Sequence, residues 1–426
     1  ASQLDVQRCC RPISEEASMD LPMAPEWMGW LALAVLVSAF ALLTWWLFFS
    51  PIVDLPRPAA SSERVLRTRR LLAVLIFGSG SLGVIGARWD ELWHRMYGGF
   101  GDDFLWPPHL LLYASLGMNV VFAGLGLGIA LRGRGGIRER FRVEPVMGLL
   151  GIIAAYQMAS ISVDLLWHEI IGPDMSAWSL PHGLLALTIS GVHVCGLAIA
   201  LSTLGERTWR SLLDHPWPME WVVLGLISMS VLNLLQFGAT EWEWSGGGRP
   251  LDAAVLARPD WAYPLVTLLI GIAAAHLALY GTARVGAASA TALVVLLVHG
   301  LTIVIYRTAV PGATLISHLL LLPPALALDA WYGLRLRQIG APAIHWGGAP
   351  IYCCVFLAVA FPYLARVIPA MEMTTGDRLA TIGIVLPLGC LTAMSFARVA
   401  VWLGRLGDPP VMAPANRAPV RRTAYS

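Results

Sequence analysis

Residues 71–131 read LLAVLIFGSGSLGVIGARWDELWHRMYGGFGDDFLWPPHLLLYASLGMNVVFAGLGLGIAL, and this stretch indicates the class of fold. It contains two apolar runs, at 71–94 and 108–131, on either side of a short polar and aromatic segment. A helix that crosses a bilayer needs about 20 mostly apolar residues, and each run is long enough. The stretch therefore predicts two membrane-spanning helices joined into a hairpin.

The same pattern recurs along the rest of the chain. Hydrophobic residues make up 57% of the sequence and charged residues only 13%, with a mean hydropathy of +0.66, whereas soluble domains carry about 25% charged residues. This composition excludes a cytosolic enzyme, a nucleic-acid-binding protein and a disordered scaffold. We expect an all-α integral membrane protein with about 11 transmembrane helices, arranged as one leading helix plus repeated helical hairpins. The predicted spans are 27–50, 71–94, 108–131, 146–169, 181–204, 217–239, 261–282, 286–306, 312–334, 349–368 and 379–404.

The distribution of arginine predicts the orientation of these spans. All 29 basic residues are Arg, and 19 of them fall in one alternate set of connections and the C-terminal tail. Because cytoplasmic loops are enriched in positive charge, we assign the Arg-rich set to the cytoplasm. With an odd number of spans, the N-terminus then lies outside and the C-terminus inside a bacterial inner membrane.

This orientation divides the chain into five regions. They are an extracytoplasmic tail at 1–26, the first span with a basic cytoplasmic loop at 27–70, a duplicated hairpin region at 71–204, further hairpins at 217–404 and a cytoplasmic tail at 405–426. We expect the short basic connections between hairpins to serve only as topological links. Asp329 lies near the cytoplasmic end of its predicted span, so we expect its carboxylate to reach the water there.

Two of the outward-facing turns carry the same pattern of residue types. Each has D-x-x-W-H, and a second His, preceded by Pro, follows 14 or 15 residues after the first. The two copies stand 73 to 74 residues apart, which indicates a duplicated hairpin. The matching acidic and imidazole positions are Asp90, His94 and His109 in the first copy and Asp164, His168 and His182 in the second.

Each copy offers the donors of a transition-metal site on the periplasmic side. An Asp and a His four residues apart share one helix face, and the second His opens the returning helix, so the three side chains are expected to converge. Two imidazoles and one carboxylate suit copper, iron, zinc or manganese and leave a position open for water or substrate. We predict that Asp102 and Asp174 orient ligating imidazoles. The competing interpretation is that these groups are polar caps at the membrane interface.

Residues 71–204 resemble a segment of the C subunit of copper membrane monooxygenases, the particulate methane and ammonia monooxygenases. In that family a D-x-x-x-H helix with Trp before the His is followed by a P-S-H stretch that opens the next helix, and an Asn-His-His set follows further along. The residues that match are Asp90, His94 and His109 for the first set and Asp164, His168 and His182 for the second. The second set here begins with Asp in place of Asn, and neither copy has the family's R-D-T stretch.

The resemblance implies copper at these residues and oxygen chemistry on a small apolar substrate, carried out in the bilayer with other membrane subunits. Two other functions fit the same residues: transport of a metal or small molecule, and a structural role in a larger respiratory or photosynthetic complex. Haem or a pigment is the less favoured cofactor, although four further His within the predicted spans could bind one. These are His193, His276, His299 and His318.

Overall fold

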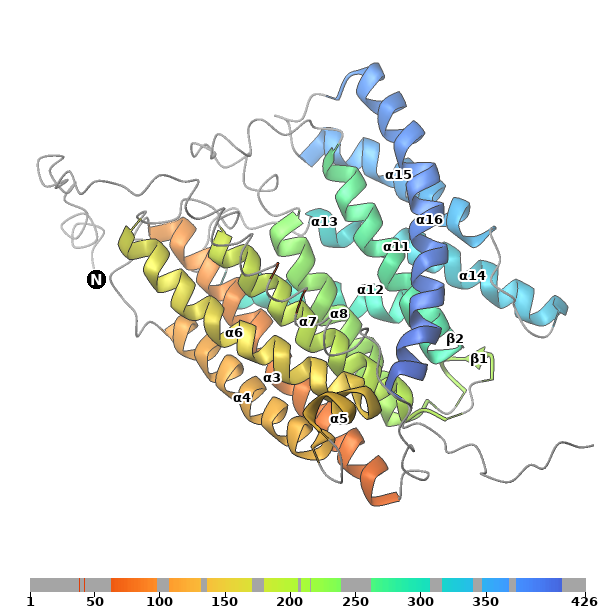
Figure 1. The fold of residues 1–426 in the computed structure, drawn as a ribbon. Coiled ribbons are helices and arrows are strands. Elements are labelled where there is room, and N and C mark those ends of the chain that lie inside the picture. Colours follow the sequence, from red (N-terminus) through yellow and green to blue (C-terminus); the bar gives the residue numbers. More distant parts are fainter. Residues whose placement is uncertain are drawn as a thin grey trace, which may run out of the picture.

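The computed structural model is a bundle of long helices (Figure 1). It describes Ser38, Leu42 and residues 63–97, 107–131, 136–170, 180–205, 208–214, 216–238, 262–306, 316–339, 347–367 and 373–407. Among these residues, seven helices are long and apolar enough to cross a membrane. The expected class, a multi-pass membrane protein built from helices, is confirmed at this level.

Most of the predicted spans coincide with observed helices to within a few residues. The helices are α3 (Glu63–Tyr97), α4 (Pro107–Ala130), α5 (Ile137–Val143), α6 (Pro145–Ile170), α7 (Leu180–Ser202), α8 (Pro218–Gly238), α11 (Ala262–Thr282), α12 (Ala287–Tyr306), α13 (Ile316–Leu319), α14 (Leu322–Ile339), α15 (Gly348–Val367) and α16 (Thr375–Gly407), with two short strands, β1 (Arg210–Ser211) and β2 (Arg284–Val285). The span predicted at 27–50 lies outside the described residues, apart from Ser38 and Leu42.

Helices α3 and α4 form an antiparallel hairpin. Near its middle, the Ser79 hydroxyl donates to Oδ1 of Asn119 over 2.6 Å, and the Ser115 hydroxyl donates to the Ser79 carbonyl oxygen over 2.7 Å. About two turns further along α3, Gly86 faces Leu112. Residue numbers rise along α3 as those of the facing residues fall along α4, which is the register of an antiparallel pair.

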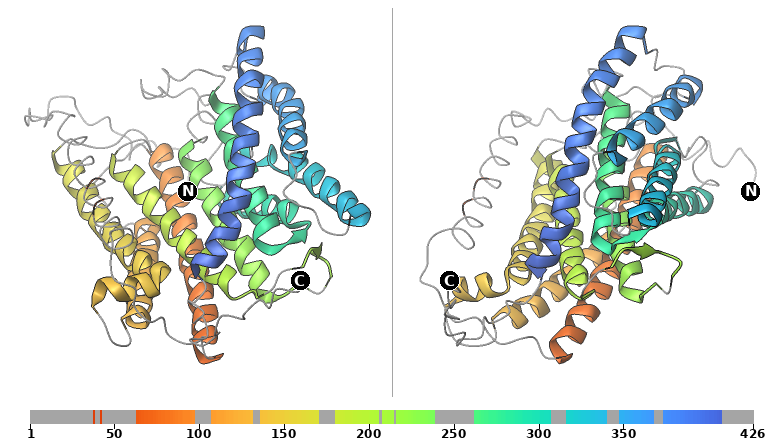
Figure 2. Two further views of the ribbon diagram at one scale, coloured as in Figure 1. Left: turned by 45° about the vertical axis from the view of Figure 1, so that its right-hand side comes forward. Right: turned by 90° about the vertical axis from the view of Figure 1, so that its right-hand side faces the viewer.

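The α3–α4 and α6–α7 hairpins lie side by side because α4 packs against α6, and α6 in turn packs against α7. Helices α7 and α8 also pack against α3, and α11 and α16 follow beyond them (Figures 1 and 2). Helix α11 lies near the centre of the bundle, since 78% of its apolar window is buried, compared with 22% for α16. The outward apolar side chains of α16 are therefore available to lipid.

The span predicted at 312–334 is broken in the structure. Helix α13 ends at Leu319 and α14 begins at Leu322, directly before Pro323. Proline has no N–H to continue the preceding helix, but its fixed backbone angle suits the first turn of a new one. Helix α14 also carries charged residues and is not among the seven described helices that are apolar enough to span. The total of eleven spans stays a prediction.

The short connections after α7 and α11 are structured, so the prediction that they serve only as links is wrong. The two-residue strands β1 and β2 pair in parallel and add a small strand element to the predicted all-α fold. The buried guanidinium of Arg284 donates to Oε1 of Glu220 over 2.9 Å. It also donates to the carbonyl oxygens of Ser211 and Asp214, each over 2.9 Å. One arginine therefore ties β2 to β1 and to the start of α8.

Two further buried charges stabilise the same end of the bundle. Asp329 accepts hydrogen bonds from the backbone N–H groups of Gly286 and Ser289, over 2.8 and 2.7 Å, and caps the start of α12. The expectation that Asp329 reaches water is wrong, because its side chain is buried. Arg69 pairs with Glu144, which follows α5. Burial raises the pKa of the Glu144 carboxyl above its ordinary value, while Arg69 acts in the opposite direction.

Candidate metal centre

The first Asp–His pair joins the two helices of the α3–α4 hairpin. Asp90 lies two turns before the end of α3, and His109 lies in the first turn of α4, which begins at Pro107. The antiparallel register brings these positions opposite each other. His109 Nε2 lies 2.8 Å from Asp90 Oδ1, and both side chains are partly exposed. The pair is thus formed by the protein itself and can still be reached from outside the bundle.

The second pair repeats this arrangement on α6 and α7. Asp164 lies near the end of α6, and His182 lies in the first turn of α7, directly after Pro181. His182 Nε2 lies 3.6 Å from Asp164 Oδ1, and both side chains are again partly exposed. This separation is longer than a direct hydrogen bond but within the range of an ion pair. The two hairpins therefore place the same two residue types together at corresponding positions.

Tyr113 lies next to the first pair and within electrostatic range of the second. It follows His109 by one turn on α4, and the two ring centroids are 5.9 Å apart with an interplanar angle of 33°. The carboxylates of Asp90 and Asp164 both lie close enough to act electrostatically on its phenol. Because α4 also packs against α6, the two Asp–His pairs lie on neighbouring hairpins.

The spacing within each pair suits two ligands of one metal ion. Ligating nitrogen and oxygen atoms lie about 2.0–2.2 Å from a transition metal, so two adjacent ligands of one ion stand about 3.0–3.4 Å apart. The two Nε2–Oδ1 distances of 2.8 and 3.6 Å bracket this range. Without an ion, the shorter contact suits an imidazole N–H that donates to a carboxylate. Small side-chain movements would convert one arrangement into the other.

The third predicted ligand of each copy is not placed. His94 and His168 belong to α3 and α6, but their side chains are outside the described part of the molecule. The predicted orienting residues Asp102 and Asp174 also lie outside the described ranges. Within those ranges, no three His, Cys, Asp or Glu side chains gather closely enough to hold an ion. The structure thus brings together two of the three predicted donors in each copy.

A buried polar network beneath the site connects the two hairpins, and the sequence analysis missed it. Asn119 on α4 accepts a hydrogen bond from Ser79 on α3, and its Nδ2 donates to Oε1 of Gln157 on α6 over 3.3 Å. Hydrogen bonds between buried side chains hold membrane helices together where water cannot compete. The signal available in the sequence was an amide side chain inside two otherwise apolar runs.

The four His considered for haem occupy different surroundings. His276 Nδ1 lies 2.9 Å from a carbonyl oxygen of its own helix. The His193 ring packs so closely on Gly80 that a methyl group at position 80 would lie 2.0 Å from Nε2, and only glycine fits there. The rings of His299 and His318 stack with centroids 3.5 Å apart. A porphyrin cannot enter between rings at that distance, so this pair does not fit a haem held from both faces.

No protein-family model, curated protein or solved structure matches the chain. The likeness to the C subunit of copper membrane monooxygenases therefore rests on the motif residues alone. The geometry of the two Asp–His pairs, by contrast, does not depend on that likeness.

Proposed function

We propose that the protein binds metal within the membrane, with copper as the favoured ion, and acts as a monooxygenase-like oxidoreductase subunit on a small apolar substrate. The observation that carries the proposal is the repeated Asp–His pair, at corresponding positions of two neighbouring hairpins. A polar cap at the membrane interface needs neither the pairing nor its repetition. The motif resemblance favours copper over zinc, iron or manganese, and it is the source of the proposed oxygen chemistry.

Each described residue of the site has a role that follows from its chemistry. Asp90 and Asp164 supply negative charge to offset a cation, and His109 and His182 supply neutral imidazole nitrogens that suit copper. Tyr113 can donate its phenolic hydrogen to a carboxylate or to a bound molecule. Copper, when bound, would supply one-electron exchange with oxygen. The apolar faces of the surrounding helices would admit an apolar substrate from the bilayer.

Metal analysis of the detergent-purified protein, before any contact with a chelator, tests the proposal. We expect copper in stoichiometric amount, and oxygen consumption that depends on both the copper and a short alkane when ascorbate is the electron donor. Metal flux into proteoliposomes without oxygen consumption would instead assign the site to a transporter. Protein that is free of metal and gains none from added copper would contradict the proposal.

The proposed orientation places the Asp–His end in the periplasm and the end with Arg284 in the cytoplasm. It is supported by the arginine distribution, since 19 of the 29 arginines fall in the C-terminal tail and the alternate set of connections that includes residues 283–285, and cytoplasmic loops are enriched in positive charge. Gly136, directly before α5, is exposed at that end, and its φ of −71° suits any residue. A substitution at this position therefore reports on the side of the membrane without disturbing the backbone.

In a variant without native cysteines, Gly136→Cys should resist an impermeant thiol reagent in intact cells. The same cysteine should react once the inner membrane is permeabilised, because only then can the reagent reach the cytoplasm. A cysteine at position 104, in the predicted periplasmic connection, is the matched control and should react in intact cells. The opposite labelling pattern would reverse the orientation and move the Asp–His pairs to the cytoplasmic side.

A further inference from the structure

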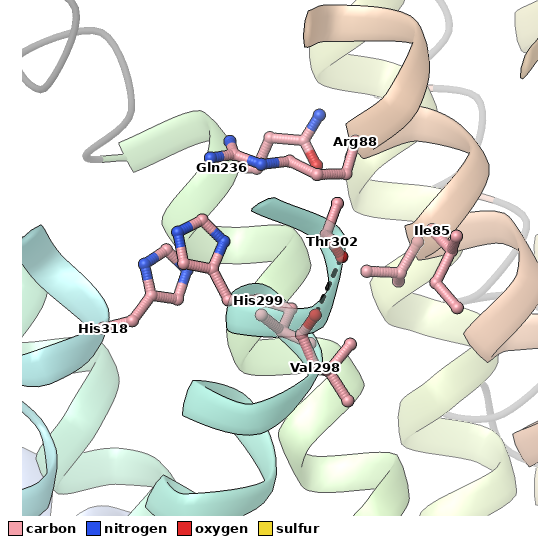
Figure 3. Close-up of a pocket in the computed structure, with 9 residues that line it drawn as sticks. Ile85, Arg88, Gln236, Val298, His299, Thr302 and His318 are labelled. Atoms are coloured by element: carbon pink, nitrogen blue, oxygen red, sulfur yellow. Dashed lines mark hydrogen bonds between the residues drawn. The ribbon is translucent and has the colours of Figure 1, made fainter. Parts of the chain in front are cut away.

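Arg88, His299 and His318 form a buried polar cluster between α3, α12 and α13 (Figure 3). The void that they line has room for about one water molecule. All three side chains already have partners within the protein. We therefore assign this cluster to packing between helices, where buried polar contacts hold membrane helices together.

Three of the four free cysteines in the described part of the chain lie on α15 and α16: Cys353, Cys354 and Cys390. Helix α15 packs against α16, and Cys353 on α15 faces Gly389 on α16. A methyl group at position 389 would lie 2.5 Å from Cys353 Sγ, so glycine at this position leaves room for the thiol. The two facing positions are equally far from the middle of the connection between the helices, which is the register of an antiparallel pair.

Cys354 and Cys390 lie on the same side of this helix interface. Successive residues of a helix are turned by about 100°. In an antiparallel pair, the residues that follow two facing positions therefore both turn toward one side of the interface. Cys354 is exposed and Cys390 is partly exposed, whereas Cys353 is buried. Two accessible thiols thus flank the line of contact between α15 and α16, beside a buried third.

The three thiols are close enough to act electrostatically on one another. Cys390 and Cys354 both act on the Cys353 thiol, and Cys354 also acts on the thiol of Cys390. Among the described residues, however, no three donors of this kind stand close enough to hold one ion together. A metal site on this hairpin would therefore use two sulfur donors.

We propose that Cys354 and Cys390 bind one Cu(I) ion between α15 and α16. Soft sulfur ligands select Cu(I) over harder cations, and Cu(I) accepts two sulfur ligands on opposite sides. On binding, two Cu–S bonds form and one S–H bond breaks, and its proton passes to water. The resulting thiolate cancels the charge of the ion, while the second sulfur donates as a neutral thiol. The filled site is neutral, which suits apolar surroundings.

The position of the thiol pair allows exchange with water. Cys354 follows Gly348, the start of α15, by six residues, which is about 9 Å along the helix axis. The pair therefore lies nearer to one membrane surface than to the centre of the bilayer. The candidate metal centre lies on α3, α4, α6 and α7 and offers nitrogen and oxygen donors, so the two sites are separate. The inference does not rest on the proposed oxidoreductase function.

Competition for Cu(I) with bathocuproine disulfonate tests the proposal, on full-length protein in lipid nanodiscs with ascorbate under argon. The reference variant carries His109→Ala and His182→Ala to empty the Asp–His pairs, and Cys9→Ser and Cys10→Ser to remove the thiols near the N-terminus. We expect this variant to retain about one Cu(I) per chain, and X-ray absorption at the copper edge should show sulfur as the nearest neighbour of the ion.

Cys354→Ser and Cys390→Ser, each made in the reference variant, should weaken Cu(I) binding at least about 100-fold, because a directly bound ligand is lost. Cys353→Ser changes the adjacent buried thiol and Cys195→Ser changes a buried thiol on α7. Both are matched controls and should keep the ion. Because Cys354 is exposed, its replacement by serine should leave the fold intact, and this variant decides the test if Cys390→Ser does not fold.

Three results would overturn the proposal: undiminished Cu(I) affinity in Cys354→Ser, loss of Cu(I) from Cys353→Ser alone, or copper without a sulfur neighbour. Absence of Cu(I) from the reference variant would also overturn it, and would leave metal at the Asp–His pairs unaffected. Cu(I) held by the reference variant would support the proposal even if the unmodified protein consumed no oxygen. Failure of the thiol site and failure of the proposed function are therefore distinguishable.

Discussion

Replacement of His109 by alanine is expected to weaken metal binding at the α3–α4 pair at least about 100-fold. Loss of a residue that only supports a metal ligand weakens binding by about 10- to 100-fold, and loss of the ligand itself should cost more. His182→Ala should have the same effect at the α6–α7 pair. Both imidazoles are partly exposed, so water can replace them without leaving a buried unpaired charge. The variants should therefore fold, and metal content per chain, measured on monodisperse protein, is the readout.

The two single variants also determine how many centres there are. If each pair holds its own ion, one substitution leaves the other ion in place and the double variant loses both. If the pairs around Tyr113 form one shared centre, either substitution alone empties it. The acids should differ as well, because Asp90→Asn forfeits charge attraction to the cation, whereas the resembled family has Asn at the position of Asp164. We expect Asp164→Asn to retain more metal than Asp90→Asn.

Asp377→Asn is the matched control for these variants. Asp377 is a partly exposed carboxylate that accepts hydrogen bonds from Thr374 at the start of α16, and it belongs to neither pair. This substitution should leave the metal content unchanged. Equal metal content in the unmodified protein, both His variants and the double variant would show that the pairs are polar caps at the interface.

Arg284→Met is expected to lower the free energy of unfolding by about 3–5 kcal/mol, the usual effect of breaking a buried ion pair from one side. The loss leaves the buried carboxylate of Glu220 without this cation and removes donors from the carbonyl oxygens of Ser211 and Asp214. Methionine fills much of the same volume, so little of the effect comes from a new cavity. Unfolding in mixed micelles with increasing SDS measures the change.

Two further variants separate the charge effect from packing. Arg284→Met combined with Glu220→Gln should recover part of the loss, since no uncompensated charge then remains buried. Arg398→Met alters an exposed arginine on α16 and should change stability by less than about 0.5 kcal/mol. A single Arg284→Met variant as stable as the unmodified protein would mean that the strand connections contribute little to the fold.

Local sequence patterns were sufficient for most of the long apolar helices and for the approach of His109 to Asp90. Run length and apolar content determine whether a helix can span a bilayer, and both are visible without any knowledge of neighbours. The approach of His109 to Asp90 was also predicted, because Asp90 lies near the end of one apolar run and His109 opens the next. The break before Pro323 was harder to predict from hydropathy, because the apolar run continues across it. The helix is interrupted there because proline has no backbone N–H to continue it.

The sequence by itself determined a multi-pass helical membrane protein and predicted that Asp90 approaches His109 and Asp164 approaches His182, because these features depend on residues close together in the chain. Only the tertiary structure brought Tyr113 within electrostatic range of both Asp164 and Asp90, buried Arg284 against Glu220, Ser211 and Asp214, and gathered Arg88 with His299 and His318. These contacts depend on how each helix is rotated and which distant helices it meets. Because the spanning helices are apolar on most sides, their sequences do not show which face of a helix meets which neighbour. Side-chain packing between helices determines it.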